Sequence, residues 1–145
     1  MITQFYLSVA VGFYLLLTIR IFGIRGNPLF KFLNYGSNNE ETVYRVVRGH
    51  GNFVEYAPLF FIMLFLLEYM ETPAITLHLL ATFFFIGRFC HGLLFSFLTS
   101  KNIILRTIGM LGTLVALFLA ALINFVHYVA SFNWTVATMV LKALP

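Results

Sequence analysis

Charged residues are the scarcest class in this sequence. They make up 10% of the 145 residues, whereas a typical soluble domain has about a quarter. Hydrophobic residues supply 61% of the chain. This amount of charge is too small to cover a water-exposed surface. We therefore predict an integral membrane protein with a single domain, residues 1–145. The net charge of +4 is too small and too dispersed to indicate nucleic acid binding. It is typical of the basic excess beside a cytoplasmic leaflet.

Cysteine is nearly absent as well. The single cysteine, Cys90, lies inside an apolar segment and has no partner for an internal disulfide. The sequence has no Cys/His spacing of the kind that holds a structural metal, so we expect no metal site. The first apolar segment lacks both a basic stretch before it and a small-residue cleavage site after it. We therefore interpret it as a retained membrane anchor.

What is abundant is long apolar sequence. A helix needs about 20 apolar residues to cross a bilayer. Four stretches meet that length and predict an all-α bundle of four transmembrane helices, at roughly residues 2–25, 40–70, 74–98 and 103–129. The tail after the fourth helix is amphipathic at best, with Trp134 as an interface anchor.

Individual residues predict how these helices begin and pack. Asn38 or Asn39 is expected to N-cap the second helix. Gly109 and Gly112 should allow the fourth helix to approach a neighbour closely. For two polar residues near the far end of that helix, we expect interhelical hydrogen bonds or an interfacial position: Asn124 and His127.

Basic residues gather around two of the three connections. The first and third connections and their helix ends carry Arg20, Arg25, Lys31, Arg45, Arg48, Lys101 and Arg106. The second connection carries only Glu68 and Glu71. The positive-inside rule places the first and third connections in the cytoplasm and both termini on the opposite side. The basic residues would therefore converge on one leaflet.

The run from 44 to 58, YRVVRGHGNFVEYAP, is the most charged part of any predicted span. Ionisable residues on a helix that enters a membrane are costly, so they indicate a functional site. At about 100° per residue, one stripe of this helix holds the following side chains: Glu41, Arg45, Arg48, Asn52 and Glu55. His50 lies on roughly the opposite side. The alternative is an interfacial turn whose arginines reach lipid headgroups.

Two further helices carry charge of the same kind. Arg88 and His91 lie one turn apart on the third helix, and Arg106 opens the fourth. If the arginines face a common cleft, they match a small zwitterionic ligand, because guanidinium groups bind carboxylates in pairs of hydrogen bonds. Glu55 would then take an ammonium group. An arginine aimed at a thiol would favour the thiolate, which is the nucleophile.

The run VYRVVRGHGNFVEYAPLF resembles the signature of the membrane-associated proteins in eicosanoid and glutathione metabolism, the MAPEG family. That signature is an arginine, a His or Gln, an asparagine and a glutamate ahead of a proline. Here these are Arg48, His50, Asn52, Glu55 and Pro58. Gly87-Arg88-x-x-His91 resembles the family's helix-three motif, and Arg106-Thr-Ile-Gly109 its helix-four start. The compact loops are similar to those of the bacterial branch.

The resemblance implies a homotrimer of four-helix subunits in a bacterial inner membrane. Glutathione would bind between neighbouring subunits near the cytoplasmic face. The implied glutathione contacts are Arg48, His50, Asn52, Glu55, Tyr56 and His91, with Arg20 or Arg25 from the first helix. Arg106 would be the catalytic residue that activates the thiol. Two departures are Phe95, where several eukaryotic members have tyrosine, and a slightly longer spacing from His91 to Arg106.

The sequence therefore predicts a glutathione-dependent membrane enzyme with a lipophilic small-molecule substrate. It would be a transferase that conjugates glutathione to electrophiles, a peroxidase that reduces lipid hydroperoxides, or both. One alternative is a non-catalytic member that binds and presents lipid. Another is a small four-span transporter with Glu55 as its coupling carboxylate.

Overall fold

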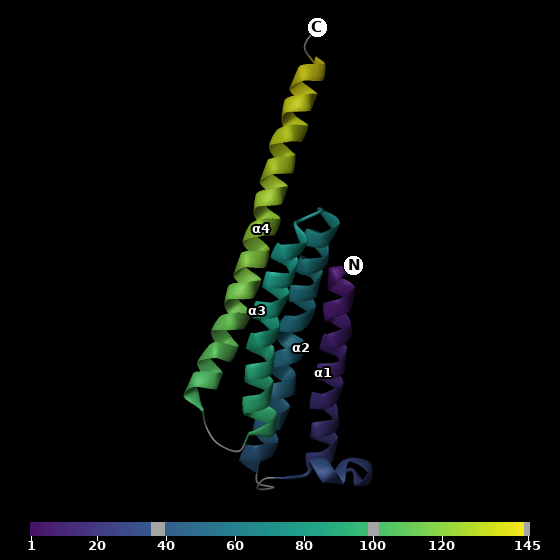
Figure 1. The fold of residues 1–145 in the computed structure, drawn as a ribbon, viewed down its shortest axis with the longest axis vertical. Coiled ribbons are helices and arrows are strands. Elements are labelled where there is room, and N and C mark those ends of the chain that lie inside the picture. The colour runs from purple at the N-terminus through teal and green to yellow at the C-terminus, as the bar shows by residue number, and fades with distance from the viewer. Residues whose placement is uncertain (36–39, 99–101, 144–145) are drawn as a thin grey trace.

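The computed structural model describes residues 1–35, 40–98 and 102–143, and these residues form four long helices. They are α1 (Ile2–Ile24), α2 (Glu40–Tyr69), α3 (Ala74–Gly92) and α4 (Ile103–Ala143). A short 3-10 helix, η1 (Pro28–Leu33), follows α1, and a π-helical turn, η2 (Leu93–Phe97), continues α3. Each long segment is apolar enough to cross a membrane. The prediction of an all-α integral membrane protein with four spanning helices is confirmed (Figure 1).

Aromatic side chains fill the contact between α2 and α3. The rings of Phe60 and Phe84 stack in parallel with centroids 4.0 Å apart, and both residues are fully buried. Phe61 and Phe85 extend the cluster with edge-on contacts. Lipid offers little hydrophobic drive for helices to associate, so such van der Waals packing holds the bundle together.

Small residues bring α3 and α4 together, as the glycines predicted. A Cβ atom added at Gly87 would lie 2.7 Å from the backbone nitrogen of Thr113. One added at Gly109 would lie 2.9 Å from Cβ of His91, and one at Gly112 would lie 3.2 Å from Cα of Gly87. The two helices therefore pack backbone against backbone, which fixes the start of α4 against the end of α3.

Hydrogen bonds tie the helices together at the end that holds the N-terminus (Figure 1). The carboxylate of Glu68 accepts hydrogen bonds from the backbone nitrogens of Ile2 and Thr3. Asn124 donates to the carbonyl of Met63 at 3.2 Å. His127 Nε2 lies 3.2 Å from the hydroxyl of Thr72. Of the two expectations for these residues, hydrogen bonding is the one present: Asn124 bonds to α2, and His127 bonds to the turn between α2 and α3.

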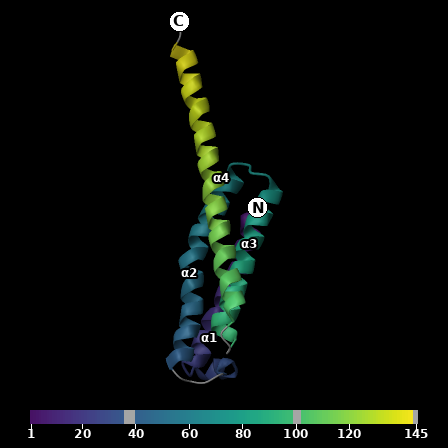
Figure 2. The same ribbon diagram turned by 90° about the vertical axis from the view of Figure 1, so that its left-hand side faces the viewer.

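The fourth helix is longer than the sequence predicted. It continues to Ala143 instead of ending near residue 129, and its last turns extend past the α2–α3 turn (Figures 1 and 2). No glycine or proline interrupts residues 130–143, so nothing in that stretch stops the helix. The N-cap predicted for Asn38 or Asn39 lies outside the described residues.

Candidate functional site

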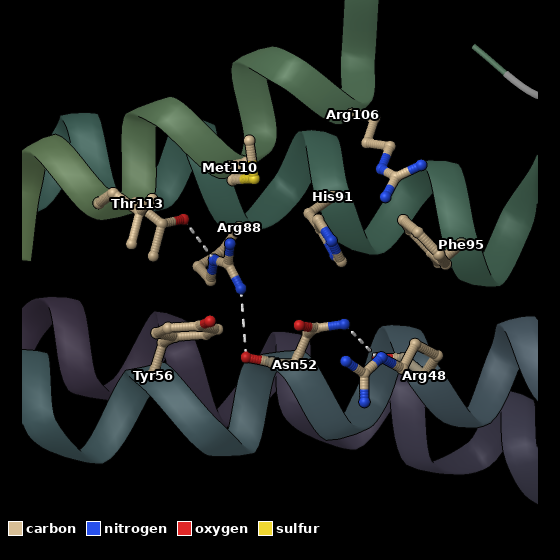
Figure 3. Close-up of a pocket in the computed structure, with 10 residues that line it drawn as sticks. Arg48, Asn52, Tyr56, Arg88, His91, Phe95, Arg106, Met110 and Thr113 are labelled. Carbon is tan, nitrogen blue, oxygen red and sulfur yellow. Dashed lines mark hydrogen bonds between the residues drawn. The ribbon is translucent and has the colours of Figure 1, made fainter. Parts of the chain in front are cut away.

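A cavity of about 230 Å³ lies between α2, α3 and α4. We call it the three-helix cavity; Figure 3 shows its lining. Its walls are Arg48, Asn52, Tyr56, Arg88, His91, Phe95, Arg106, Met110, Thr113 and Leu114. The charges that the sequence placed on three separate helices therefore share one space. It lies toward the basic end of the bundle, away from the N-terminus.

Arg88 joins the three helices behind this cavity. It is 3% exposed, and its Nε donates to the hydroxyl of Thr113 on α4 at 2.6 Å. Its Nη1 donates to the carbonyl of Asn52 on α2 at 3.1 Å, and its Nη2 to that of Gly109 at 3.2 Å. The guanidinium also lies 5.0 Å from the ring centre of Tyr56. Arg88 thus holds the walls in place, a role that the sequence analysis did not assign.

Arg48 and Arg106 differ from Arg88 because their guanidinium groups do not connect the helices. Within residues 1–35, 40–98 and 102–143, neither side chain has a hydrogen bond or ion pair with the protein. In Figure 3, the side chain of Arg106 points from α4 toward Phe95, and Arg48 lies across the cavity on α2. Guanidinium groups held in this way are typical of a site for carboxylates or other anions.

His91 lies between these arginines. It is 8% exposed, and its ring stacks on Phe95 with centroids 4.5 Å apart. A positive charge on the His91 ring would be repelled by the charges of Arg88, Arg106 and Arg48. Its Nδ1 has no hydrogen-bond partner among the described residues. Buried polar atoms are nearly always paired, so this nitrogen is a candidate ligand contact.

The polar stripe of α2 supplies the opposite wall. Asn52 Nδ2 donates to the carbonyl of Arg48 at 2.9 Å, and this bond orients the amide beside the arginine. Tyr56 lines the cavity one turn further along. Glu55 is exposed and does not line the cavity, but its carboxylate is close enough to Arg88 to interact electrostatically. An ammonium group at the cavity edge could therefore reach Glu55.

Besides Glu55, three predicted ligand contacts lie outside the three-helix cavity of their own chain. Arg20 is 2% exposed, and its guanidinium donates to the carbonyls of Ser96, Leu33 and Tyr35. Because its donors already have partners, the geometry favours Arg25, which is exposed at the C-cap of α1.

His50 is the third of these contacts. It faces α1, where its Nε2 lies 3.1 Å from the hydroxyl of Thr18 and its ring 5.0 Å from that of Tyr14. Its position on the opposite side of α2 from Arg48 and Asn52 is the one that helical periodicity predicted.

Residues 3–126 match the model of the MAPEG family. The chain belongs to the MAPEG family. This family generally uses glutathione and includes glutathione transferases and peroxidases, but also non-catalytic members. Comparisons with curated proteins and with solved structures gave no match. The family match includes every residue of the three-helix cavity, while the last turns of α4 lie beyond it.

Sequence reasoning missed part of the α4 wall of this MAPEG cavity. Met110, Thr113 and Leu114 were not singled out, although they line it. They lie four, seven and eight residues after Arg106, which places them on the same helical face. Helical spacing from Arg106 was therefore the signal that could have found them.

Proposed function

We propose that this MAPEG protein is a glutathione-dependent membrane enzyme. It conjugates glutathione to lipophilic electrophiles, reduces lipid hydroperoxides, or does both, through a thiolate stabilised by Arg106. One observation carries the proposal: Arg48 and Arg106 border one cavity, and neither has a partner among the described protein side chains. An anionic ligand that contacts both arginines would supply the hydrogen-bond acceptors that the described residues do not.

Glutathione matches this arrangement in charge and in the placement of its groups. It carries two carboxylates, one ammonium group and a thiol. Arg48 binds a carboxylate, Asn52 pairs with a peptide group, and Glu55 receives the ammonium. Tyr56 and His91 complete the contacts, with the unpaired Nδ1 of His91 facing the ligand. Hydrogen bonds between charged groups contribute more to binding where those groups are removed from water.

The thiol then lies against Arg106. A positive charge beside a thiol lowers its pKa and raises the fraction of thiolate. In conjugation, the sulfur attacks the electrophilic carbon, a C–S bond forms, and the leaving group departs with its electron pair. In peroxide reduction, the sulfur attacks the terminal oxygen, the O–O bond breaks and a sulfenic acid forms. The alkoxide leaves with the bonding electrons and takes a proton from water to become an alcohol. A second glutathione then reduces the sulfenic acid to yield a disulfide and water.

The proposal includes a homotrimer in a bacterial inner membrane, with the site near the cytoplasmic face and the termini on the opposite side. Two observations support it. The basic residues gather at the end of the bundle away from the N-terminus, in agreement with the positive-inside rule. Arg25 and His50 lie outside their own chain's three-helix cavity, so we assign them to the glutathione site of the neighbouring subunit.

An ultraviolet difference titration with glutathione near neutral pH tests the proposal. Thiolate absorbance should rise and saturate in the detergent-purified parent and be absent in Arg106→Ala. Lys142→Ala, which removes one positive charge near the far end of α4, should behave as the parent. Saturable binding without thiolate would indicate a non-catalytic binder, and absence of binding would favour a transporter.

A further inference from the structure

The connection between α1 and α2 contains η1, which lies beside the bundle and outside its core. None of its six residues, all of which the structure describes, is buried. Figure 1 shows this short coil next to the end of α1, on the side away from α4. Only residues 25–27 separate it from α1, a candidate membrane span, and three residues reach about 10 Å at most. Therefore η1 lies near the membrane surface at the basic end of the bundle.

The protein holds η1 firmly against α1. A Cβ atom added at Gly23 of α1 would lie 2.6 Å from the carbonyl oxygen of Phe30 and 3.0 Å from Cβ of Leu33. The buried guanidinium of Arg20 donates to the carbonyls of Leu33 and Tyr35. With one side fixed on α1 in this way, the residues on the other side of η1 have a fixed outward direction.

The outward side chains of η1 are large and apolar. Leu29 is 80% exposed and Phe32 is 73% exposed. Residues three apart share a face in a 3-10 helix, and the bend at Phe30 between them leaves both side chains exposed. The ring of Phe30 lies 6.0 Å from that of Phe22, which is 44% exposed on α1. The apolar surface of η1 is thus continuous with the exposed surface of a membrane span, and such surfaces mark contact sites.

Positive charge accompanies this apolar surface. Lys31 lies between the two outward side chains in the sequence and is exposed. No acidic residue precedes Glu40 in the chain, so the net charge of this part of the protein is positive. Basic residues beside a cytoplasmic leaflet are attracted to its anionic lipids. An apolar face next to a basic one is typical of segments that lie in the interface of a membrane.

We propose that η1 is a membrane-surface anchor that binds anionic phospholipid. Leu29 and Phe32 enter the boundary between head groups and acyl chains, and Lys31 contacts a lipid phosphate. The anchor is independent of the chemistry that we propose for the three-helix cavity.

One buried side chain connects the anchor to that cavity. Besides the two carbonyls at the end of η1, Arg20 donates to the carbonyl of Ser96 in η2 at 2.9 Å. The same turn carries Phe95, which lines the three-helix cavity. The depth of η1 in the leaflet therefore also fixes the depth of this wall of the cavity.

Spin labels on single cysteines test the anchor, because two relaxing agents distinguish lipid, water and protein around a label. Oxygen concentrates in the apolar part of a bilayer, whereas nickel ethylenediaminediacetate stays in water. The full chain with Cys90→Ala carries each new cysteine in vesicles of phosphatidylglycerol and phosphatidylcholine. Labels at Leu29→Cys and Phe32→Cys should be accessible to oxygen and shielded from the nickel complex.

Lys31→Cys is the matched control from the same turn. Its label should be several times more accessible to the nickel complex than the labels at 29 and 32. Phe118→Cys, at a position 67% exposed within the α4 span, gives the reference for lipid contact. High nickel access at 29 and 32 would show that they lie in water. Low access to both agents would show that a second copy or another protein covers them, and either result would overturn the anchor.

The phosphate contact is tested with two lysines. Phosphatidylglycerol added to the detergent-purified protein should raise its melting temperature, whereas phosphatidylcholine should do so less and inorganic phosphate not at all. Lys31→Gln should raise the phosphatidylglycerol concentration at half effect about fivefold, as expected for one basic side chain at an anionic surface. Lys142→Gln, near the far end of α4, should match the parent. Equal midpoints in the two variants, or an equal effect of inorganic phosphate, would overturn the assignment of Lys31.

Discussion

The guanidinium of Arg88 and the hydroxyl of Thr113 form a buried hydrogen bond of 2.6 Å that joins α3 to α4. The same guanidinium reaches α2 through the carbonyl of Asn52. One charged side chain thus determines the distances between the three helices that carry the candidate ligand contacts. Arg88 is a positioning residue, while Arg48 and Arg106 are the arginines that we propose contact glutathione.

Replacement of Arg88 should therefore damage both stability and binding. Arg88→Ala removes the hydrogen bonds that this side chain donates to the Thr113 hydroxyl and to the carbonyls of Asn52 and Gly109. We expect a loss of about 3 kcal/mol in the free energy of unfolding, since hydrogen bonds to charged groups contribute about 1.5–3 kcal/mol each and losses are not additive. Thermal unfolding in detergent measures it. Arg25→Ala removes an exposed arginine and should leave the melting temperature unchanged.

Close approach of α3 and α4 gives a second prediction. In Gly87→Ala, the new Cβ would lie 2.7 Å from a backbone nitrogen of α4, so the helices must separate. We expect a destabilisation of about 1–3 kcal/mol, typical of overpacking, and a lower yield of bound thiolate. Gly12→Ala is the control, because a Cβ there meets no atom within 4 Å. Equal melting temperatures for the two variants would contradict the packing described here.

Arg48 should matter for the ligand and not for the fold. It is exposed, and its side chain has no partner among the described residues. Arg48→Ala should weaken glutathione binding by a few kcal/mol, as when one partner of a desolvated charge pair is truncated, and should leave the oligomer assembled. Calorimetry and size-exclusion chromatography measure the two effects. Unchanged affinity would remove Arg48 from the site.

The extension of α4 should be dispensable for glutathione binding. The cavity lining ends at Leu114 and the family match at residue 126. A chain that ends at Val129 keeps the contact of His127 with Thr72. It should bind glutathione with parental affinity in the difference titration. A loss of binding would show that the last turns of α4 support the site.

Helical periodicity and the placement of charge predict much of the candidate site from the sequence alone. Arg48 and Asn52 share a stripe that the 100° rotation per residue predicts, and His50 lies on the other side as that rotation requires. The glycines of α4 predicted a close helix contact because only a missing side chain allows one. These features depend on local geometry, which the order of residues determines.

Other features depend on contacts between segments far apart in the chain. Arg20 donates to one carbonyl in η2 and to another after η1, and nothing in the residues around it predicts where those carbonyls lie. The structural role of Arg88 depends in the same way on the packing of three helices. The length of α4 was underestimated because its end was predicted from the point where the sequence becomes less apolar. The residues after that point are more polar but still form a helix.

The most direct test of the account is the pKa of the glutathione thiol while it is bound, measured from thiolate absorbance as a function of pH. A free thiol has a pKa of about 8.5. The thiol of glutathione bound to the parent should have a lower pKa than the free thiol. In Arg106→Ala the pKa should return toward the free value, and in Arg106→Lys it should lie in between. A bound thiol with the same pKa in the parent and in Arg106→Ala would contradict the central claim.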